Sequence, residues 1–186
     1  MTVQEIEALD IRNSAIHECG HAFVGRHYKL GGAPSIWKNE DADPVERTTW
    51  QGTTQYCNLK ITPMKHRRIA IAGIVAEMIE ELDPLEDLFI NVLESQLDGS
   101  YSEVFEETEG WSLTDWQGAQ GWTSRDFYCV VRILRRNWKN LILEAERLIE
   151  LGIEDGYFAK DPEEYKHLWA LALDDYHDME KITGRS

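Results

Sequence analysis

The chain has 186 residues, of which 42% are hydrophobic and seven are tryptophan. A chain of this length is expected to bury one hydrophobic core and is too short for two domains of ordinary size, so we expect a single domain over residues 1–186. Asp and Glu number 34 against 19 Lys and Arg, which gives a formal net charge of -15. Such a charge repels phosphate backbones and anionic lipids, so we expect neither nucleic acid nor a membrane as a partner.

The cellular compartment is predicted from two further features. No apolar stretch approaches the roughly 20 residues that span a bilayer, and the first ten residues, MTVQEIEALD, lack the basic and apolar regions of a secretion signal. The three cysteines, Cys19, Cys57 and Cys129, are odd in number and widely spaced, which argues against a disulfide framework and against a CxxC metal site. We therefore expect a cytoplasmic protein.

The first predicted elements are a helix and a small sheet. Thr2 and Glu5 have the spacing of a capping box, and the apolar residues that follow keep helical spacing until the glycine pair at 31–32. Residues 35–38 and 48–61 are rich in Thr, Trp, Tyr and Ile, and turn residues separate them. This composition predicts two or three strands that form a small sheet.

Helices dominate the remainder of the predicted fold. We expect one helix over 62–82, where the basic cluster at 65–68 is interpreted as a solvated first turn, and another over 83–99. A polar, acidic loop is expected over 98–112.

Further helices are expected to complete the chain. A short helix over 114–120 precedes an apolar stripe, from Phe127 to Ile149, that predicts a long packed helix. A final helix is expected to begin near Asp161. The predicted fold class is α+β, mainly helical, with the first helix beside a small sheet and a helical C-terminal part.

The HECGH run inside the first predicted helix has the spacing of a zinc site. Residues four apart on a helix differ in direction by about 40°, so His17 and His21 can offer two imidazole nitrogens to one zinc ion. Glu18 lies about 100° further round, where its carboxylate can take a proton from an activated water without becoming a ligand. Cys19 points to the opposite side, at about 200°, and is expected to be a small core residue.

A catalytic zinc ion normally has three protein ligands, so two histidines leave one position to fill. His27 has the spacing of the third histidine of metzincins, but the turn glycine of that pattern falls at Val24 here. Glu40 lies in a turn-rich segment, which is a poor match to the rigid helix that usually presents a glutamate ligand. Neither residue is a strong candidate.

Four segments of the chain resemble the peptidase domain of FtsH-type proteases, and most closely its short stand-alone relatives. They are AIHECGHAFV at 15–24, IAIAGIVAEMI at 69–79, LTDW with the following residues at 113–119, and NWKNLILEAERLIELG at 137–152. The first segment is specific, the second and third are moderately so, and the last alone would mean little.

This resemblance implies a third zinc ligand well downstream of the first helix, at Asp115. It also implies that the AGIVAE helix packs on the HECGH helix, with Gly73 permitting close approach and Glu77 near the site. Two alternatives stay open: Ser112 to Asp115 also has the spacing of a helix cap, and Glu77 could be the third ligand or could orient a histidine.

The chain also departs from the large members of that family. Their ATPase module and membrane anchor have no counterpart in these 186 residues, and an acidic insertion lies at about residues 101–110. We therefore expect an enzyme that cannot unfold a stable substrate by itself.

The substrate side of the site is the least defined by the sequence. Residues 53–60 could form a sheet edge to which an extended peptide adds. Trp111, Trp116 and Trp122 bracket Asp115 and are candidates for an apolar subsite, although core aromatic residues are the simpler interpretation. Tyr28 is a candidate for stabilising negative charge on the substrate.

The leading functional prediction is a Zn2+-dependent endopeptidase that hydrolyses peptide or unfolded protein substrates, with Glu18 as general base. One alternative is a regulatory module that keeps the metal site and binds a partner. Another is a metallopeptidase of a different lineage, such as those that cleave repressors. The oligomeric state is not predicted by the sequence.

Overall fold

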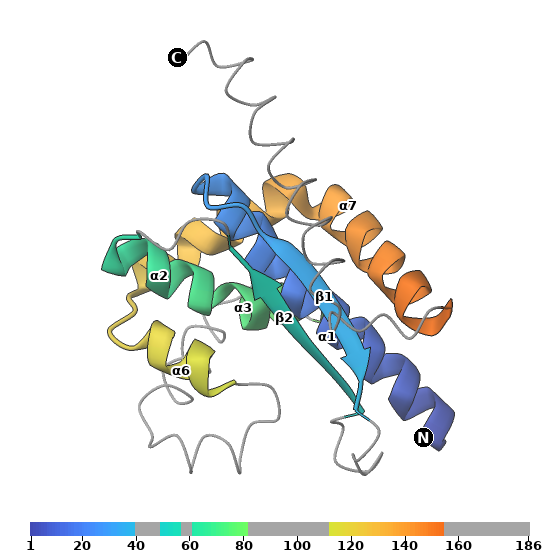
Figure 1. Cartoon of the computed structure of the whole chain (residues 1–186). Helices are drawn as coiled ribbons and strands as arrows, with labels where there is room; N and C mark the ends of the chain where they lie inside the picture. Colours follow the sequence, from blue (N-terminus) through green and yellow to red (C-terminus); the bar gives the residue numbers. More distant parts are fainter. Residues whose placement is uncertain (40–48, 57–60, 82–111, 155–186) are drawn as a thin grey trace.

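The computed structural model describes residues 1–39, 49–56, 61–81 and 112–154. Within them the fold is α+β and mainly helical, as predicted. The elements in chain order are α1 (Val3–His27), β1 (Ala33–Lys38), β2 (Trp50–Gln55), α2 (Pro63–Ala70), α3 (Ala72–Glu81), α6 (Leu113–Ala119) and α7 (Ser124–Glu154) (Figure 1). No helix in these ranges is both long and apolar enough to cross a membrane.

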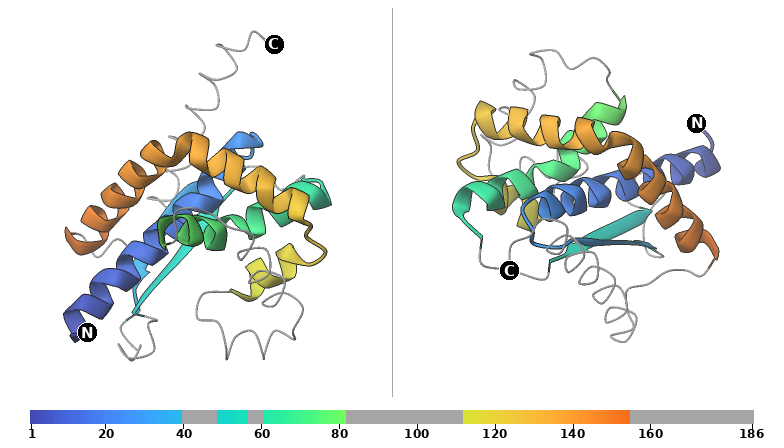
Figure 2. Two further views of the ribbon diagram at one scale, coloured as in Figure 1. Left: turned by 180° about the vertical axis from the view of Figure 1, so that it is seen from behind. Right: turned by 90° about the horizontal axis from the view of Figure 1, so that it is seen from above.

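Helix α1 occupies the centre of the fold. It begins as predicted, because the side chain of Thr2 caps the backbone N–H of Glu5 and the Glu5 carboxylate accepts from the N–H of Thr2. The two strands pack on one side of α1, while α3 and α7 pack on others, and Figure 2 shows α1 between the strands and α7. Because neighbours surround it, Ile16, Cys19 and Val24 are fully buried. The core position predicted for Cys19 is confirmed.

Strands β1 and β2 form a two-stranded antiparallel sheet. Ile36 pairs with Gly52, and Pro34 pairs with Thr54. The start of β2 is tied to α1, because the hydroxyl of Ser14 donates to the carbonyl oxygen of Trp50 at 3.2 Å. The two predicted strands are confirmed, although the second is shorter than the predicted range 48–61, since β2 spans Trp50–Gln55, and residues 48 and 57–60 lie outside the described part of the chain.

The single helix predicted over 62–82 is wrong: the structure has two helices there. Thr62 caps α2 as expected, but Ile71 has φ -84° and ψ -5°. A ψ near zero is far from the helical value of about -42°, so the chain turns at this residue before α3 begins. Gly73 and Glu77, both on α3, contact His17 of α1.

Helices α6 and α7 agree with the prediction to within a few residues at each end. The apolar stripe of α7 is its buried face, which comprises Phe127, Val130, Ile133, Leu134, Leu141, Ala145 and Leu148. The predicted helix over 83–99, nearly all of the predicted acidic loop and the helix expected from Asp161 lie outside the described residues.

Helices α1 and α3 approach closely because a glycine stands at their contact. A Cβ atom added to Gly20 would lie 2.6 Å from the carbonyl oxygen of Ala72 and 2.8 Å from the Cβ of Ala76. Only glycine fits at such a separation without a shift of backbone. The close approach predicted for these two helices is confirmed, and it sets how far side chains on α1 must reach to contact α3.

The basic cluster of α2 is not simply solvated, which corrects its interpretation as an exposed first turn. Arg68 is 9% exposed, and its Nε donates to Oδ1 of the buried Asp126 at 2.7 Å. Arg67 donates to Oδ2 of the same carboxylate at 3.4 Å. This ion pair joins α2 to the first turn of α7.

We expect Asp126→Asn to lower the free energy of unfolding by about 3–5 kcal/mol, because it leaves the buried Arg68 guanidinium without a charged partner. Glu80→Gln is the matched control, since it breaks the more exposed pair of Glu80 with Arg12 and should cost less than about 1 kcal/mol. Urea denaturation at neutral pH measures both values. Equal losses in the two variants would contradict the buried role of Asp126.

The effect of Asp126→Asn should also depend on pH. Burial raises the pKa of Asp126, but its bonds with Arg68, Thr123 and Arg67 outweigh burial and lower that pKa. The stability that the carboxylate contributes is therefore complete above the pKa of an ordinary aspartate, about 3.9, and is lost as the pH falls through the lower folded pKa. The difference between variant and wild type should shrink in that acid range.

Candidate metal centre

His17 and His21 project from one face of α1, and their Nε2 atoms lie 3.0 Å apart. The Nδ1 of His21 lies 2.7 Å from the carbonyl oxygen of Ile69, at the end of α2. The Nδ1 of His17 bonds with the carboxylate of Glu77 on α3. A carbonyl oxygen can only accept, so His21 carries its proton on Nδ1 and, when neutral, presents an unprotonated Nε2. Glu77 favours the same tautomer in His17, and both lone pairs then face one point.

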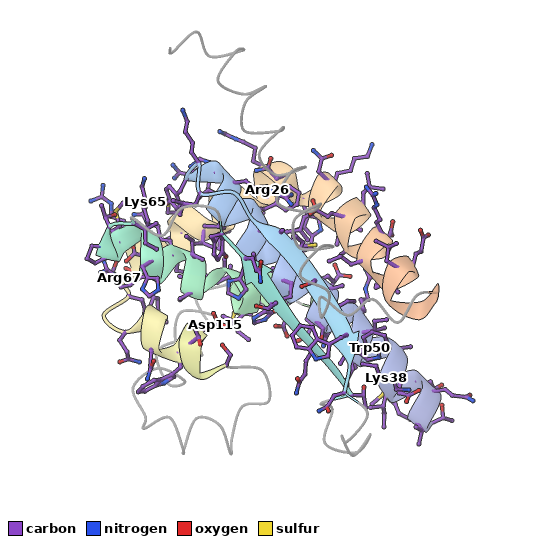
Figure 3. All side chains as sticks on the ribbon, in the orientation of Figure 1. Arg26, Lys38, Trp50, Lys65, Arg67 and Asp115 are labelled. Atoms are coloured by element: carbon purple, nitrogen blue, oxygen red, sulfur yellow. The ribbon has the colours of Figure 1, made fainter. Side chains whose placement is uncertain are left out.

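Asp115 completes a set of three donor atoms around that point. Its Oδ2 lies 3.6 Å from Nε2 of His17 and 3.5 Å from Nε2 of His21. Figure 3 shows Asp115 on α6, on the side nearest α3 and β2. Ligand atoms at roughly 2.0–2.2 Å from a tetrahedral zinc ion lie roughly 3.3–3.6 Å from one another. The observed separations, together with that of 3.0 Å between the two histidines, therefore fit a single small cation.

Asp115 is both a member of this set and part of a helix cap, so the two alternatives for it are compatible. Its backbone N–H donates to the hydroxyl oxygen of Ser112 at 3.0 Å, and that hydroxyl donates to Oδ2 at 2.7 Å. Burial raises the pKa of Asp115, but the charge of His21 and the hydrogen bonds with both histidines outweigh burial and lower that pKa well below its usual value. The aspartate is therefore ionised at neutral pH and available as an anionic ligand.

The surrounding carboxylates favour positive charge at the imidazoles. Burial alone lowers the pKa of His17 and of His21. Bonds with Asp115 and Glu77 outweigh burial at His17, and the charge and hydrogen bond of Asp115 outweigh it at His21, so both pKa values are raised. A site that attracts positive charge in this way suits a cation as well as a proton.

Glu18 stands beside the three donor atoms and is not one of them. It is 7% exposed, and its Oε2 lies 2.7 Å from the hydroxyl of Thr54 on β2. Burial raises the pKa of Glu18 above its usual value, although the two histidines and Thr54 partly oppose this shift. The carboxylate fits against β2 because residue 52 is glycine, where an added Cβ atom would lie 2.8 Å from Oε1 of Glu18.

Glu77 holds His17 and does not join the donor set. Its bond with Nδ1 places it behind the imidazole, on the side away from Asp115, because the opposite nitrogen faces that aspartate. The contact between Glu77 and His17 depends on Gly73, since an added Cβ atom at residue 73 would overlap the imidazole of His17. The expected approach of Gly73 and Glu77 to the histidine helix is confirmed, and the geometry favours Glu77 as a residue that orients a ligand.

Other residues considered for the site lie elsewhere. His27 is exposed near the end of α1, and burial and the charges of Arg136 and Arg68 lower its pKa. Cys19 is buried in the core. Glu40 and Cys57 lie outside the described residues.

The aromatic candidates for the substrate side are also placed away from the donor atoms or in the core. The hydroxyl of Tyr28 accepts from Arg68 at 2.9 Å and lies 3.8 Å from Sγ of Cys129, so the geometry does not support a role for Tyr28 in stabilising substrate charge. Trp116 and Trp122 are partly buried and pack against the core, which favours the simpler interpretation of them. Trp111 lies outside the described residues.

Three contributors to the site were not identified from the sequence. Gly52 and Thr54 are two residues apart on β2, so both lie on the same face of the strand. The structure shows that this face is the one toward Glu18. The third is the carbonyl oxygen of Ile69, a backbone atom that no residue type signals. The glycine and threonine two residues apart in a strand-like segment were the available clue.

The described residues also line a hollow of about 490 Å³ formed by Arg68, Ser124, Arg125, Tyr128, Cys129 and Arg132. None of these residues belongs to the donor set or contacts Glu18 through a hydrogen bond. The hollow is therefore separate from the candidate metal centre.

No family model matches the sequence, and a search of curated proteins finds no match.

Asp115→Ala should weaken Zn2+ binding by more than about 100-fold, because it would remove one of the three candidate donor atoms, whereas Glu77→Gln should cost only about 10–100-fold, as is typical of a residue that orients a ligand. Competition against a chromophoric chelator measures both affinities. A larger loss for Glu77→Gln than for Asp115→Ala would identify Glu77 as the third ligand.

Gly73→Ala should reduce Zn2+ affinity by at least about 10-fold, because the new methyl group displaces the imidazole of His17. Gly152→Ala on α7 is the matched control, since the atoms nearest to its Cβ would be the ring of Trp50, at 3.1 Å, and the side chain of Ile36, neither of which belongs to the donor set. The same chelator competition applies. Unchanged affinity in Gly73→Ala would show that the contact between α1 and α3 does not position His17.

Proposed function

We propose that this chain is a zinc-dependent peptidase of the HEXXH type. The observation that carries the proposal is the convergence of Nε2 of His17, Nε2 of His21 and Oδ2 of Asp115 within 3.0–3.6 Å of one another, with Glu18 buried beside them. Two imidazoles and one carboxylate form a common ligand set for catalytic zinc. A purely structural zinc site would normally have a fourth protein ligand, whereas the described part of the chain brings three donor residues together here.

His17, His21 and Asp115 would hold the ion. Nitrogen and oxygen donors at this spacing suit Zn2+ better than Mg2+ or Ca2+, which prefer oxygen ligands alone. When bound, zinc polarises a carbonyl group and lowers the pKa of a water molecule. The hydrogen bonds of Glu77 and of the Ile69 carbonyl keep both imidazoles in the tautomer that this role requires.

Glu18 would act as the general base. It takes a proton from the attacking water and later delivers that proton to the leaving amine. Burial supports this role, because it raises the pKa of Glu18 toward the range in which a carboxylate can both accept and return a proton. The hydroxyl of Thr54, 2.7 Å from Oε2, fixes the direction of the carboxylate.

Strand β2 would align the substrate. β2 pairs with β1 along one edge, and no other strand among the described residues pairs with it. An extended peptide that adds to the other edge would run past Thr54 and Glu18 with its backbone hydrogen-bonded to the strand. Recognition through backbone groups predicts broad specificity for unfolded or extended segments.

The resemblance to FtsH-type peptidases supports the same proposal. The positions expected from it, Asp115 as a ligand, Gly73 at a close helix contact and Glu77 near the site, agree with the distances given above. We therefore propose a zincin-like fold related to the stand-alone members of that group. Its substrates would be peptides or proteins that are already unfolded.

The proposal is tested by two measurements on the purified protein: elemental analysis for zinc, and digestion of casein and of a peptide library with and without 1,10-phenanthroline. We expect stoichiometric zinc and cleavage that the chelator abolishes. Bound zinc without cleavage of any peptide would contradict the peptidase assignment and would favour a binding module.

Glu18→Gln should lower kcat by about 10²–10⁴-fold while leaving zinc content unchanged, because the residue supplies a base and no ligand. Glutamine keeps the size of the side chain and can still bond with Thr54. Glu144→Gln, which changes a carboxylate paired with Arg26, is a control that should keep full activity. Loss of zinc in Glu18→Gln would contradict the assigned role.

A further inference from the structure

The hollow of about 490 Å³ described above is lined by residues of α2 and of the first turns of α7. Three of these residues are arginines: Arg68 comes from α2, and Arg125 and Arg132 come from α7. The two helices contact each other, and Figure 2 shows the start of α7 beside α2. Helices that are far apart in the sequence therefore bring three guanidinium groups to one hollow, which we call the arginine hollow.

Arg68 is the fixed member of this group. It is 9% exposed, its Nε donates to Asp126 at 2.7 Å, and its Nη1 donates to the hydroxyl of Tyr28 at 2.9 Å. These are the hydrogen bonds that Arg68 forms among the described residues, and a guanidinium group has five N–H donors. The side chain is therefore held in one orientation and has donors left for a ligand.

Arg125 and Arg132 are the exposed members of the group. They are seven residues apart on α7, which is close to two helical turns, so both lie on the face that also carries Tyr128 and Cys129. Neither arginine forms an ion pair with any residue in the described ranges. Their charges are therefore available to an anion that enters the hollow.

The charge around the arginine hollow is opposite to that of the whole chain. Residues 124–143 include one acidic residue, Asp126, and five basic ones: Arg125, Arg132, Arg135, Arg136 and Lys139. Helix α2 has basic residues and no acidic one. Charges more than about 8 Å away are largely screened at physiological ionic strength, so this local excess outweighs the net charge of -15.

His27 gives a second indication of positive charge in this region. Burial lowers the pKa of His27, and the charges of Arg136 and Arg68 lower it further. Positive charge on this side of the molecule thus disfavours the binding of one more proton. The same charge favours an anion.

The number of charges indicates which anion suits the arginine hollow. Guanidinium groups bind carboxylates and phosphates through pairs of hydrogen bonds. A phosphate group carries a charge of about -1.5 to -2 at neutral pH and has three acceptor oxygens, so several guanidinium groups can share it. Asp126 already pairs with Arg68, and the two charges of Arg125 and Arg132 therefore match a dianion better than a single carboxylate.

The size of the hollow indicates that the phosphate belongs to a larger molecule. Sites for small molecules occupy roughly 300–1,000 Å³, and the arginine hollow falls in this range. A phosphate ion alone would leave much of the space empty. Tyr128, which is 51% exposed, and Cys129 provide a less polar part of the wall.

We propose that the arginine hollow binds the phosphate group of a small molecule, with Arg68, Arg125 and Arg132 donating hydrogen bonds to the phosphate oxygens. The remainder of the molecule packs against Tyr128. This binding does not require the proposed peptidase function, because none of these residues belongs to the donor set of the candidate metal centre.

Calorimetric titration of the purified full chain with ADP tests the proposal. Arg125→Gln and Arg132→Gln should each raise the Kd at least about 10-fold, as expected for the loss of a hydrogen bond to a charged group. Both side chains are exposed, so the variants should unfold at the same urea concentration as the wild type.

Arg147→Gln is the matched control, because it makes the same change of charge at an exposed position of α7 that does not line the hollow. It should change the Kd less than about 2-fold, since a distant charge is screened. An equal loss of affinity in Arg147→Gln would indicate general attraction of anions and would overturn the site. The absence of any binding of ADP or inorganic phosphate at millimolar concentration would also overturn it.

Titrations with inorganic phosphate and with citrate identify the chemistry of the ligand. ADP should bind more tightly than inorganic phosphate, because its remaining atoms fill the hollow. Inorganic phosphate that binds as tightly as ADP would support the arginine site and identify the free ion as its ligand. Citrate has carboxylates alone, and tighter binding of citrate than of either phosphate compound would overturn the phosphate assignment.

Alkylation of Cys129 by iodoacetamide locates the bound molecule, because this cysteine lines the hollow. ADP at ten times its Kd should slow the alkylation about 10-fold, in proportion to the fraction of protein that remains free. Mass spectrometry of the peptide that contains Cys129 measures the rate. A rate that ADP leaves unchanged would show that the anion binds elsewhere, and the proposal would be wrong.

Discussion

The candidate metal centre depends on how closely α1 and α3 pack. Gly20 removes the side chain that would hold the helices apart, and Gly73 removes the one that would displace His17. At this separation Glu77 reaches Nδ1 of His17 and fixes which nitrogen faces Asp115. On the other side of α1, Glu18 packs against Gly52 and Thr54 of β2. The absence of a side chain at Gly20 and at Gly73 therefore allows the contact between α1 and α3 that positions His17.

Electrostatics then distinguishes two carboxylates that lie within a few ångströms of the same imidazoles. The charge of His21 and the interactions of Asp115 with both imidazoles lower the pKa of Asp115 despite burial. Glu18 is more deeply buried against β2, and desolvation outweighs the attraction of the histidines and raises its pKa. One carboxylate that stays ionised and one that can carry a proton are therefore produced by environment, from side chains of nearly identical chemistry.

The sequence predicted the parts of this arrangement that follow from local spacing. HECGH on an apolar-periodic segment placed His17, Glu18 and His21, and the capping residues placed the start of α1. Asp115 was implied only by family resemblance, because nothing local brings the side chain of Asp115 to the two histidines of α1. The turn at Ile71, the contact of Thr54 with Glu18 and the Ile69 carbonyl depend on tertiary packing and strand register, which spacing along the chain does not encode.

Helix α6 is short, spanning Leu113–Ala119, and a helix of this length is not stable alone in water. An ion shared by His21 and Asp115 would cross-link α6 to the central helix across a long stretch of chain, and so would reduce the conformational entropy of that stretch in the way a disulfide does. Metal occupancy and the docking of α6 would then be thermodynamically linked, each strengthening the other. The ion would serve the architecture of the protein as well as its reaction.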